Sequence, residues 1–378
     1  MKIGIITIHN SPNYGASLQA FSLWKYMTDC GYDCEIIDLH RPHQDDFVPS
    51  KKYVPCRIAK RRFKTRVKRA IFGLFRKKNP VKCLTDEAKE KFDKFNSQIK
   101  LSKPYLSVDE LYSNPPLYDV YITGSDQLWN PTQPFCIEPY FLTFAPDRKK
   151  KVSYASSIGI TELTEKEKVL FRESLRRYDA ISVREIQAKV LLEKIVGKDI
   201  VQVADPTFLL PQETWKANAV YPRMRKKFLL LFTLAYNAPL LEYALHLSSQ
   251  SGLKVVYLTS MQPSGNEMYE SVVNAGPREW LGYIAHAEMV ITDSFHGTVF
   301  SIIMGTNNFF THIAKSNHRG SRITSLLHTF GLSDHLLKQE LNQNYNELMA
   351  LRVNHERVAE IIQEERRHSQ GFLTQHLS

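Results

Sequence analysis

Short apolar runs alternate with segments of helical spacing along most of this chain, and this order constrains the fold more than any other sequence feature. Residues 3–8 form an apolar run that ends in turn-forming residues at 9–15. Apolar residues then fall at helical spacing up to about Gly31, and a second apolar run covers 34–39. A strand, a helix and a second strand in this order are typical of a parallel sheet with helices on its faces. The sequence therefore predicts an α/β fold.

Two sets of predicted elements divide the chain. The first set has strands at 3–8, 34–39, 119–123, 151–155, 180–183 and 200–203, and a helix at 162–177. The second has strands at 228–234, 255–258, 289–292 and 308–311, helices at 240–250 and up to 304, and a last helix at about 346–367. Residues 206–226 are rich in proline and charge, which is typical of a boundary. The predicted domains are residues 1–210 and 211–342, followed by a C-terminal helix at 343–378.

The formal net charge of +11 comes from one segment. Residues 51–82 contain fourteen lysines and arginines and no acidic residue, whereas the rest of the chain is close to neutral. This distribution argues against a nucleic-acid-binding surface spread over the whole protein and indicates one local cationic patch. Apolar residues within the segment fall close to helical spacing, which predicts a basic amphipathic helix inserted in the first domain at about 48–100.

Several protein classes are excluded by what the sequence lacks. It has no run of eighteen apolar residues, so no transmembrane helix is predicted, and its start turns polar too early for a signal peptide. Five scattered cysteines favour reduced thiols, and we therefore expect a cytoplasmic protein. The fingerprints of dinucleotide and nucleoside-triphosphate binding and the short zinc motifs are absent, so we predict neither a metal nor a cofactor.

Polar side chains at the ends of predicted strands are the candidate site residues, because ligands of open α/β sheets bind beyond the carboxyl ends of the strands. His296 follows the strand at 289–292 and opens a helix beside a glycine. A helix N-terminus attracts anions, and a bound anion would favour a protonated imidazole that can act as an acid. The alternative interpretation is a buried histidine that caps the turn.

Two further strand ends carry polar side chains. Arg184 follows the strand at 180–183, and its guanidinium suits a bidentate grip on phosphate or carboxylate, although a salt bridge to the next helix is the alternative. Asp126 follows the strand at 119–123 and could accept sugar hydroxyls beside the ring of Trp129, the alternative being a turn or a helix cap.

A cationic group follows the last strand. It consists of Lys315, His318, Arg319 and Arg322, with Gly320 among them. Such a loop could close over an anionic ligand, and the alternative is a solvated surface loop.

In their order and spacing, the strand-end motifs resemble the polysaccharide pyruvyl transferase family. The motifs that carry this resemblance are KIGIIT at 2–7, NYGASLQA at 13–20, TGSDQLWN at 123–130, YASSIG at 154–159, SVRE at 182–185, ADPT at 204–207, TDSFHG at 292–297 and SRI at 321–323. The match runs from residue 1 to about 335 and is interrupted by the basic segment.

The resemblance implies two Rossmann-like domains that face each other across a cleft, as in GT-B glycosyltransferases. It implies phosphoenolpyruvate as the donor and, as the acceptor, a sugar of a surface or capsular polysaccharide or of its lipid-linked precursor. The product would be a pyruvate ketal on two hydroxyls, with phosphate released and no cofactor beyond the substrates. A lipid-linked acceptor would bring residues 51–82 to the anionic inner face of the cytoplasmic membrane, and no nucleic-acid partner is expected.

The resemblance also assigns roles to residues. His296 matches the histidine expected to act as the general acid, and Arg184 matches the arginine expected to hold the anionic groups of the donor. Lys315 corresponds more loosely to a basic residue expected after the last strand, whereas Ser294 stands where some members carry an arginine. The residues assigned to the donor side are Arg184, Lys315, Arg322, Ser294 and Phe295. Those assigned to the acceptor side of the cleft are Asn13, Tyr14, Ser125, Asp126, Trp129, Asn130 and Ser156.

Two other functions are open at this point. One is a glycosyltransferase of the same architecture that uses a nucleotide-sugar donor. The other is a non-catalytic protein whose residues 51–82 bind a membrane or a nucleic acid, although such a protein has no need of organised strand-end motifs.

Overall fold

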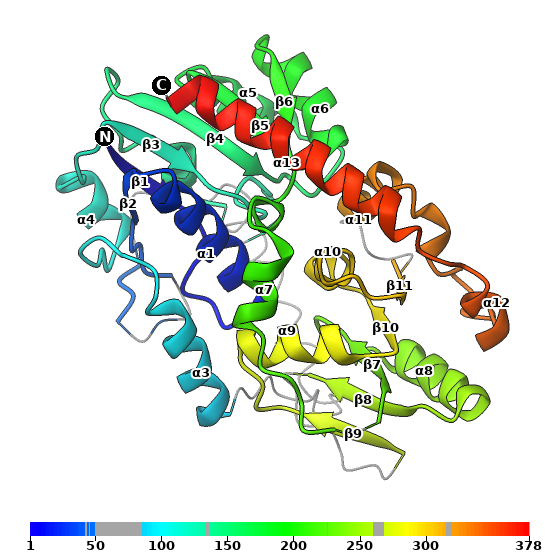
Figure 1. Cartoon of the computed structure of the whole chain (residues 1–378). Helices are drawn as coiled ribbons and strands as arrows, with labels where there is room; N and C mark the ends of the chain where they lie inside the picture. Colours follow the sequence, from blue (N-terminus) through cyan, green and yellow to red (C-terminus); the bar gives the residue numbers. More distant parts are fainter. Residues whose placement is uncertain are drawn as a thin grey trace, which may run out of the picture.

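The computed structural model describes residues 1–41, 44, 46–49, 85–133, 136–224, 226–259, 268–314 and 320–377. Within them the chain forms two parallel β-sheets with helices packed on both (Figure 1). The predicted basic helix lies outside the described residues, as do Lys315, His318 and Arg319.

The first sheet has six parallel strands in the order β2–β1–β3–β4–β5–β6. Its strands are β1 (Lys2–Ile6), β2 (Asp33–Ile36), β3 (Val120–Thr123), β4 (Lys150–Ser156), β5 (Ala180–Val183) and β6 (Ile200–Gln202). The central strands are buried along almost their whole length, because helices cover the sheet. A strand buried on both faces needs apolar side chains throughout, which explains the continuous apolar runs in the sequence.

The described helices of the first half all begin with a side-chain cap except α6 (Ile186–Val196). They are α1 (Tyr14–Asp29), α3 (Asp86–Asn96), α4 (Val108–Ser113), α5 (Glu165–Leu175) and α6, with 3₁₀ turns η1 (Glu138–Phe141) and η2 (Pro206–Phe208). The side chains of Asn13, Thr85, Ser107 and Thr164 each accept a backbone N–H of the first helical turn. These caps satisfy amide groups that have no partner within the helix, and they fix where the helices begin.

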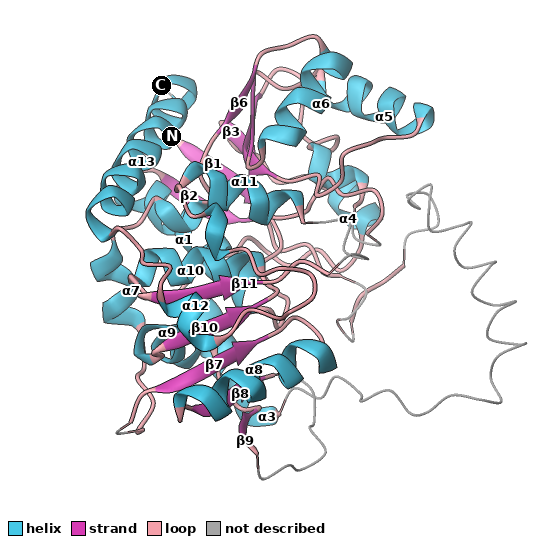
Figure 2. Ribbon diagram, turned by 90° about the vertical axis from the view of Figure 1, so that its right-hand side faces the viewer, coloured by secondary structure: helices cyan, strands magenta, loops and turns pink. Residues whose placement is uncertain are grey.

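The second sheet has five parallel strands in the order β11–β10–β7–β8–β9. Its strands are β7 (Phe228–Phe232), β8 (Lys254–Leu258), β9 (Tyr269–Val272), β10 (Met289–Thr292) and β11 (Asn308–Thr311). The helices of this half are α7 (Gln212–Asn218), α8 (Ala238–Ser251), α9 (Pro277–His286), α10 (Phe295–Met304) and α11 (Ser321–Thr329), with the 3₁₀ turn η3 (Ser333–His335). The two sheets lie one above the other in the view of Figure 2.

The chain ends in α12 (Tyr345–Met349) and α13 (His355–Leu377). The single helix predicted at 346–367 is therefore wrong, because the helical path stops at Met349 and restarts at His355. From the second half α13 runs back to the first sheet (Figure 1). There the guanidinium of Arg366 donates to the carbonyl oxygens of Phe208 and Leu210, at 2.7 and 3.0 Å.

The start of α1 packs against the second half of the chain. The ring of Tyr14 stacks on that of Trp280 with a centroid distance of 5.4 Å, and its hydroxyl donates to the carbonyl oxygen of Ala275 at 3.0 Å. Phe92 of α3 packs on Tyr14 from another side, at 5.1 Å. These buried contacts hold the first turn of α1 beside α9.

The α/β fold with two parallel sheets confirms the prediction from the sequence. Strand β9 and helices α3, α4, α7, α9 and α11 were not predicted. Helix α3 falls within the stretch predicted as an insertion, yet its Phe92 and Phe95 are buried in the core together with α1.

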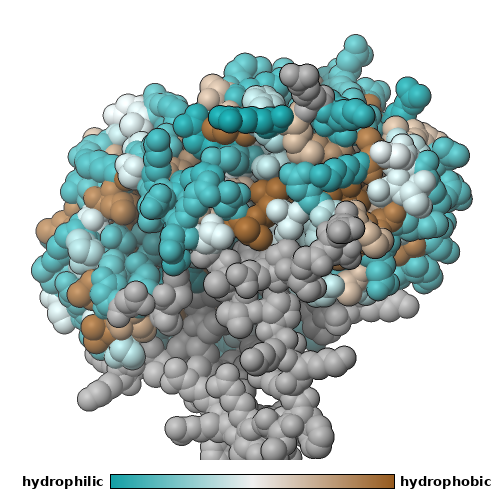
Figure 3. Space-filling view, turned by 90° about the horizontal axis from the view of Figure 1, so that it is seen from below, coloured by the Kyte–Doolittle hydropathy of each residue, from teal (hydrophilic) through white to brown (hydrophobic). Residues whose placement is uncertain are grey.

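The described surface is largely hydrophilic on the face shown in Figure 3, where apolar side chains occur in small groups. Among the described residues, no helix combines the length and the apolar character that a membrane span requires.

Candidate functional site

Two strand ends of the first sheet and one of the second meet at a single carboxylate. Arg184 directly follows β5, Asp205 comes shortly after β6, and His296 stands in the first turn of α10, just after β10. The carboxylate of Asp205 lies 2.6 Å from Nη1 of Arg184 and 3.5 Å from Nε2 of His296. A histidine of the second half thus lies near a carboxylate of the first half that also binds a guanidinium.

Asp205 is fixed by further hydrogen bonds, and its side chain has no exposed surface. Its Oδ1 accepts from the amide and the hydroxyl of Thr207 at 3.1 and 2.8 Å, and its Oδ2 accepts from the hydroxyl of Ser125 at 3.3 Å. Burial alone would raise the pKa of Asp205, but the neighbouring His296 and Arg184 outweigh it and hold this pKa well below its ordinary value. Asp205 therefore stays ionised; it is the counter-ion of Arg184 and also faces the imidazole of His296.

Arg184 is a buried cation with spare hydrogen-bond donors. Its guanidinium carbon lies 4.2 Å from the ring centroid of Phe295, which holds the guanidinium plane in place. Nη1 donates to Asp205, whereas Nε and Nη2 make no hydrogen bond to any residue that the structure describes. The nearest other carboxylate is that of Asp126, 3.8 Å from Nη2. A buried N–H of a charged group that makes no hydrogen bond costs free energy. This arrangement therefore favours an anionic ligand that accepts from Nε and Nη2.

His296 is positioned by the turn that starts α10 and by a glycine across from it. The hydroxyl of Ser294 caps the helix by accepting from the amide of Gly297 at 3.3 Å. A Cβ at Gly15 would stand 2.0 Å from Nδ1 of His296, so the imidazole lies directly on the backbone of α1. Any larger residue at position 15 would displace the ring.

Arg322 adds a second guanidinium beside the first. It comes from α11, is almost fully buried, and lies 5.3 Å from the ring centroid of Phe295. With its amide turned so that the oxygen faces Arg322, Gln127 accepts from Nη2 and Nη1 at 2.7 and 3.1 Å. Phe295 is thus shared by Arg184 and Arg322, which brings two of the predicted donor-side cations to one ring.

Among the residues predicted for the acceptor side, Ser125 and Asp126 lie beside Arg184. Asn13 caps α1 by accepting from the amide of Ala16, and Tyr14 is buried between the two halves of the chain. The hydroxyl of Ser125 donates to Asp205, and that of Ser156 donates to the carbonyl oxygen of Gly124. Each of these side chains already has a structural partner.

Asp126 and Asn130 lie at the turn after β3. Asp126 adopts a left-handed conformation with φ of 76°, and its carboxylate accepts from the amide of Gln127. It remains partly exposed and faces Arg184. Asn130 is fully buried, and its side-chain oxygen accepts from the amide and hydroxyl of Thr132.

Trp129 does not offer a ring face to a sugar. It has no exposed surface, its ring stacks on that of Phe141 at 5.6 Å, and its indole N–H donates to the carbonyl oxygen of Tyr140. The prediction is corrected because η1 folds over the turn after β3 and covers this ring.

Two residues of interest were not predicted as site residues. Asp205 was noted only as part of a motif, although its place after a strand would have marked it. His312 follows β11 and is 6% exposed, and neither of its ring nitrogens has a partner among the described residues. Burial lowers the pKa of His312.

The model of the family described as polysaccharide pyruvyl transferase matches residues 13–311, a stretch that contains Arg184, Asp205 and His296. The chain belongs to the polysaccharide pyruvyl transferase family. It is therefore a transferase, and the family implies a polysaccharide as acceptor. Among curated proteins, none matches this sequence.

This chain is similar to solved structures at low sequence identity. The UDP-GlcNAc 2-epimerase of Methanocaldococcus jannaschii, solved with UDP-GlcNAc and UDP, superposes with a TM-score of 0.51 at 12% identity, over 96% of this chain and 99% of that chain. The glycosyltransferase SnogD of Streptomyces nogalater gives a TM-score of 0.43 at 12% identity, over 98% and 95% of the two chains. The first of these likenesses supports the predicted GT-B-like arrangement of two Rossmann-like domains.

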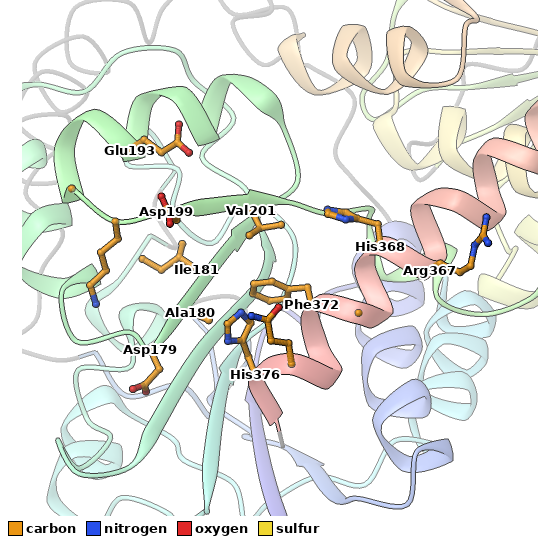
Figure 4. A pocket seen from close by; sticks show the side chains of 14 residues that line it. Asp179, Ala180, Ile181, Glu193, Asp199, Val201, Arg367, His368, Phe372 and His376 are labelled. Carbon is orange, nitrogen blue, oxygen red and sulfur yellow. The ribbon is translucent and has the colours of Figure 1, made fainter.

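Among the described residues, no three histidine, cysteine or acidic side chains are grouped to hold a metal ion. A cavity of about 1,090 Å³ lies between β5, β6, α6 and α13 (Figure 4). It opens beside Asp179 and Asp199, which precede β5 and β6, so it lies at the amino ends of these strands, away from Arg184.

Proposed function

We propose that this transferase moves the pyruvyl group of phosphoenolpyruvate onto two hydroxyls of one sugar, forming a pyruvate ketal and releasing phosphate. The observation that carries the proposal is the buried guanidinium of Arg184, whose Nε and Nη2 lack hydrogen-bond partners among the described residues. These two N–H groups form the fork that binds a carboxylate or phosphate bidentately.

Phosphoenolpyruvate carries two anionic groups and needs more than one cation. Arg322 shares the Phe295 ring with Arg184, and the positive end of α10 points to the same region. Ser294 supplies no charge at the position where some family members carry an arginine. We assign the missing charge to Arg322, with Lys315 as a further candidate that lies outside the described residues.

The proposed reaction begins with a proton from His296 to the methylene carbon of the donor, which makes the adjacent carbon electrophilic. One acceptor hydroxyl attacks that carbon and returns its proton to the imidazole. The carbon–oxygen bond to phosphate then breaks, and the second hydroxyl attacks the same carbon. The proton of this second hydroxyl leaves with the phosphate. The imidazole, which gave one proton and took one back, is again protonated at the end. Asp205 stabilises the imidazolium form throughout by its fixed negative charge.

We place the acceptor in a surface or capsular polysaccharide or its lipid-linked precursor, and the protein on the cytoplasmic side of the membrane. The basic segment 51–82 supports this assignment, because clustered lysines and arginines bind anionic lipid surfaces. The test is flotation with vesicles that contain anionic lipid, compared with a variant lacking residues 51–82. Equal recovery of both proteins in the vesicle fraction would overturn the membrane contact.

The donor is tested by the melting temperature of the protein with phosphoenolpyruvate, phosphate, or UDP- and CMP-sugars. A ligand that binds the folded state must raise it. We expect a rise with phosphoenolpyruvate that is lost in Arg184→Ala and reduced in Arg184→Lys, which keeps the charge but not the fork. Arg357→Ala is the matched control, because Arg357 is an exposed arginine of α13 paired with Glu360.

The outcomes separate the candidate donors. A rise with phosphoenolpyruvate that persists in Arg184→Ala would show that the anion binds elsewhere. A rise only with a nucleotide sugar would replace pyruvyl transfer by glycosyl transfer.

A further inference from the structure

A second cavity lies at the carboxyl edge of the first sheet, outside the site built around Asp205. It measures about 880 Å³, within the range of roughly 300–1,000 Å³ usual for ligand pockets. The loop at residues 9–12 after β1, the residues after β2, and one face of α3 line it. We call it the N-terminal pocket. Because ligands of parallel sheets bind beyond the carboxyl ends of the strands, its place in the fold is that of a substrate site.

A chain of imidazoles and carboxylates forms one wall of the N-terminal pocket. Nε2 of His9 lies 2.9 Å from Oδ1 of Asp38, and Nε2 of His40 lies 3.7 Å from Oδ2 of the same carboxylate. Nδ1 of His40 lies 2.8 Å from Asp46. Burial alone would raise the pKa of Asp38, but His9 and His40 outweigh it and lower this pKa. Asp38 is therefore held as a carboxylate, a strong and fixed acceptor for hydroxyl groups.

Another part of the lining combines polar and apolar groups of α3 and the residues after it. The side-chain oxygen of Asn96 is buried and has no hydrogen-bond partner among the described residues. Asp93 is exposed, and the side chains of Ile99 and Leu101 add apolar surface nearby. Acceptors of hydroxyl groups set beside apolar surface match a sugar ring, which has hydroxyls at its rim and C–H groups on its faces.

The charged side chains that line the N-terminal pocket disfavour binding of phosphoenolpyruvate, the proposed donor. Its one described lysine, Lys89, is paired with Asp86 at 3.1 Å, outside the lining residues. Three aspartates, Asp38, Asp46 and Asp93, face the pocket, and its two histidines, His9 and His40, are each paired with one of these carboxylates. This is the reverse of the site at Arg184, where cationic donors are left over. An anion is repelled by such a lining, whereas a neutral polyol is accepted.

The N-terminal pocket is also close to the reacting groups. Pro12 lines it, and Gly15, three residues further on, lies against His296. Three residues of chain span at most about 11 Å, so the pocket and the imidazole are separated by roughly the length of a disaccharide or less. A sugar bound in the pocket can present hydroxyls of its neighbouring residue to the site.

We propose that the N-terminal pocket binds a neutral sugar residue of the acceptor, with Asp38 as the main acceptor of its hydroxyls. This proposal rests on the proposed function, because only that function makes the bound sugar an acceptor. The binding of a sugar to the pocket is tested without turnover. It predicts that donor and acceptor bind to separate groups of residues, one cationic and one acidic.

The experiment is saturation-transfer NMR with the full chain and the methyl glycosides of glucose, galactose, mannose and N-acetylglucosamine, with methyl glucuronide as the anionic member. We expect transfer to at least one neutral glycoside and none to the glucuronide. Asp38→Asn should weaken that binding about tenfold or more, as expected for a lost hydrogen bond to a charged group. Ser97→Trp, at an exposed position of the rim, should block the pocket while leaving the fold intact.

Asp29→Asn is the matched control, because Asp29 is an exposed aspartate of α1 whose partner is Lys25. The melting-temperature rise with phosphoenolpyruvate, measured on every variant, shows folding and an intact donor site. Absence of transfer to every neutral glycoside, or equal transfer in wild type, Asp38→Asn and Ser97→Trp, would overturn the pocket assignment and leave the donor site standing. Pocket-dependent transfer without any effect of phosphoenolpyruvate would instead retain the sugar site and overturn the proposed function.

Discussion

The guanidinium of Arg184 donates to the carboxylate of Asp205 at 2.6 Å, in surroundings where the carboxylate has no exposed surface. A buried ion pair of this kind adds little to the free energy of unfolding, because the cost of desolvating both charges offsets much of their attraction. Its role here is to position side chains, since the same carboxylate also lies 3.5 Å from His296. One buried charge therefore sets the place of both groups that the proposed chemistry needs.

Asp205→Asn is expected to separate binding from catalysis. The amide keeps the shape but removes the negative charge, so the site becomes more cationic and the KM for phosphoenolpyruvate should fall or stay constant. The imidazolium of His296 loses its counter-ion, and kcat should fall by about 10²-fold or more, within the usual contribution of a positioned acid. Steady-state kinetics with varied phosphoenolpyruvate measure both. A raised KM with unchanged kcat would mean that Asp205 serves donor binding alone.

Gly15→Ala is expected to damage catalysis while sparing the donor site. The new Cβ would stand 2.0 Å from Nδ1 of His296, so the ring must move. A shift of about 1 Å can cost about 10²-fold in rate, whereas Arg184 is untouched and the melting-temperature rise with phosphoenolpyruvate should persist.

Gly371→Ala is the control for that substitution. Nothing lies within 4 Å of a Cβ at Gly371 in α13, so alanine there should stabilise the fold by about 0.5–1 kcal/mol and leave the rate unchanged. Full activity of Gly15→Ala would contradict the contact between α1 and His296.

Trp129→Ala is expected to act on stability alone. The ring is fully buried against Phe141, so its loss should lower the free energy of unfolding by about 3–5 kcal/mol. Because no ring face is open to a sugar, the KM for the acceptor should not change at temperatures where the variant is folded. Denaturant unfolding and kinetics at low temperature test the two halves of this prediction. A raised acceptor KM at full folding would restore the sugar-stacking interpretation.

Much of the fold could be predicted because its strands are buried on both faces and so appear as continuous apolar runs. The strand predicted at 308–311 has the same bounds in the structure. Strand ends led to Arg184 and His296, because ligands of parallel sheets bind beyond the carboxyl ends of the strands. The two residues belong to different sheets, so their meeting at Asp205 could not be predicted in this way. The edge strand β9 was missed because its four residues, YESV, have two polar residues in the middle and form no apolar run.

Contacts between distant segments could not be predicted. Tyr14 and Ala275 are far apart in the chain, and nothing local in either sequence shows that one donates to the other. Trp129 was assigned to the site because an aromatic ring beside an aspartate after a strand suits a sugar. The ring is buried because Phe141 of η1 packs on it, and the local sequence around Trp129 does not predict where η1 lies.

Tyr14→Phe isolates one bond between the two halves of the chain. The substitution keeps the stack on Trp280 and leaves the buried carbonyl oxygen of Ala275 without its donor. The free energy of unfolding should fall by about 1–3 kcal/mol. Tyr221→Phe, at a half-exposed tyrosine, is the control and should have no measurable effect. Equal stability of wild type and Tyr14→Phe would show that the stacking alone holds α1 in place.

Acid is expected to destabilise the fold through buried histidines of the second half. Burial lowers the pKa of His312, and burial outweighs the carbonyl oxygen of Phe309 to lower that of His335 as well. The unfolded chain has a histidine pKa of about 6.5, so below that pH it binds protons that the folded chain refuses. The free energy of unfolding therefore falls as the pH drops below about 6.5, until the folded-state pKa values are passed.

His312→Leu should remove part of that pH dependence, because its ring nitrogens have no partner to lose among the described residues. Denaturant unfolding of wild type and variant from pH 8 to pH 5 measures the effect, and the two stability curves should converge or cross as the pH falls. His246→Leu, at an exposed histidine of α8, is the control and should run parallel to wild type. Parallel curves for His312→Leu and wild type would mean that His312 takes up its proton equally in the folded and unfolded chain.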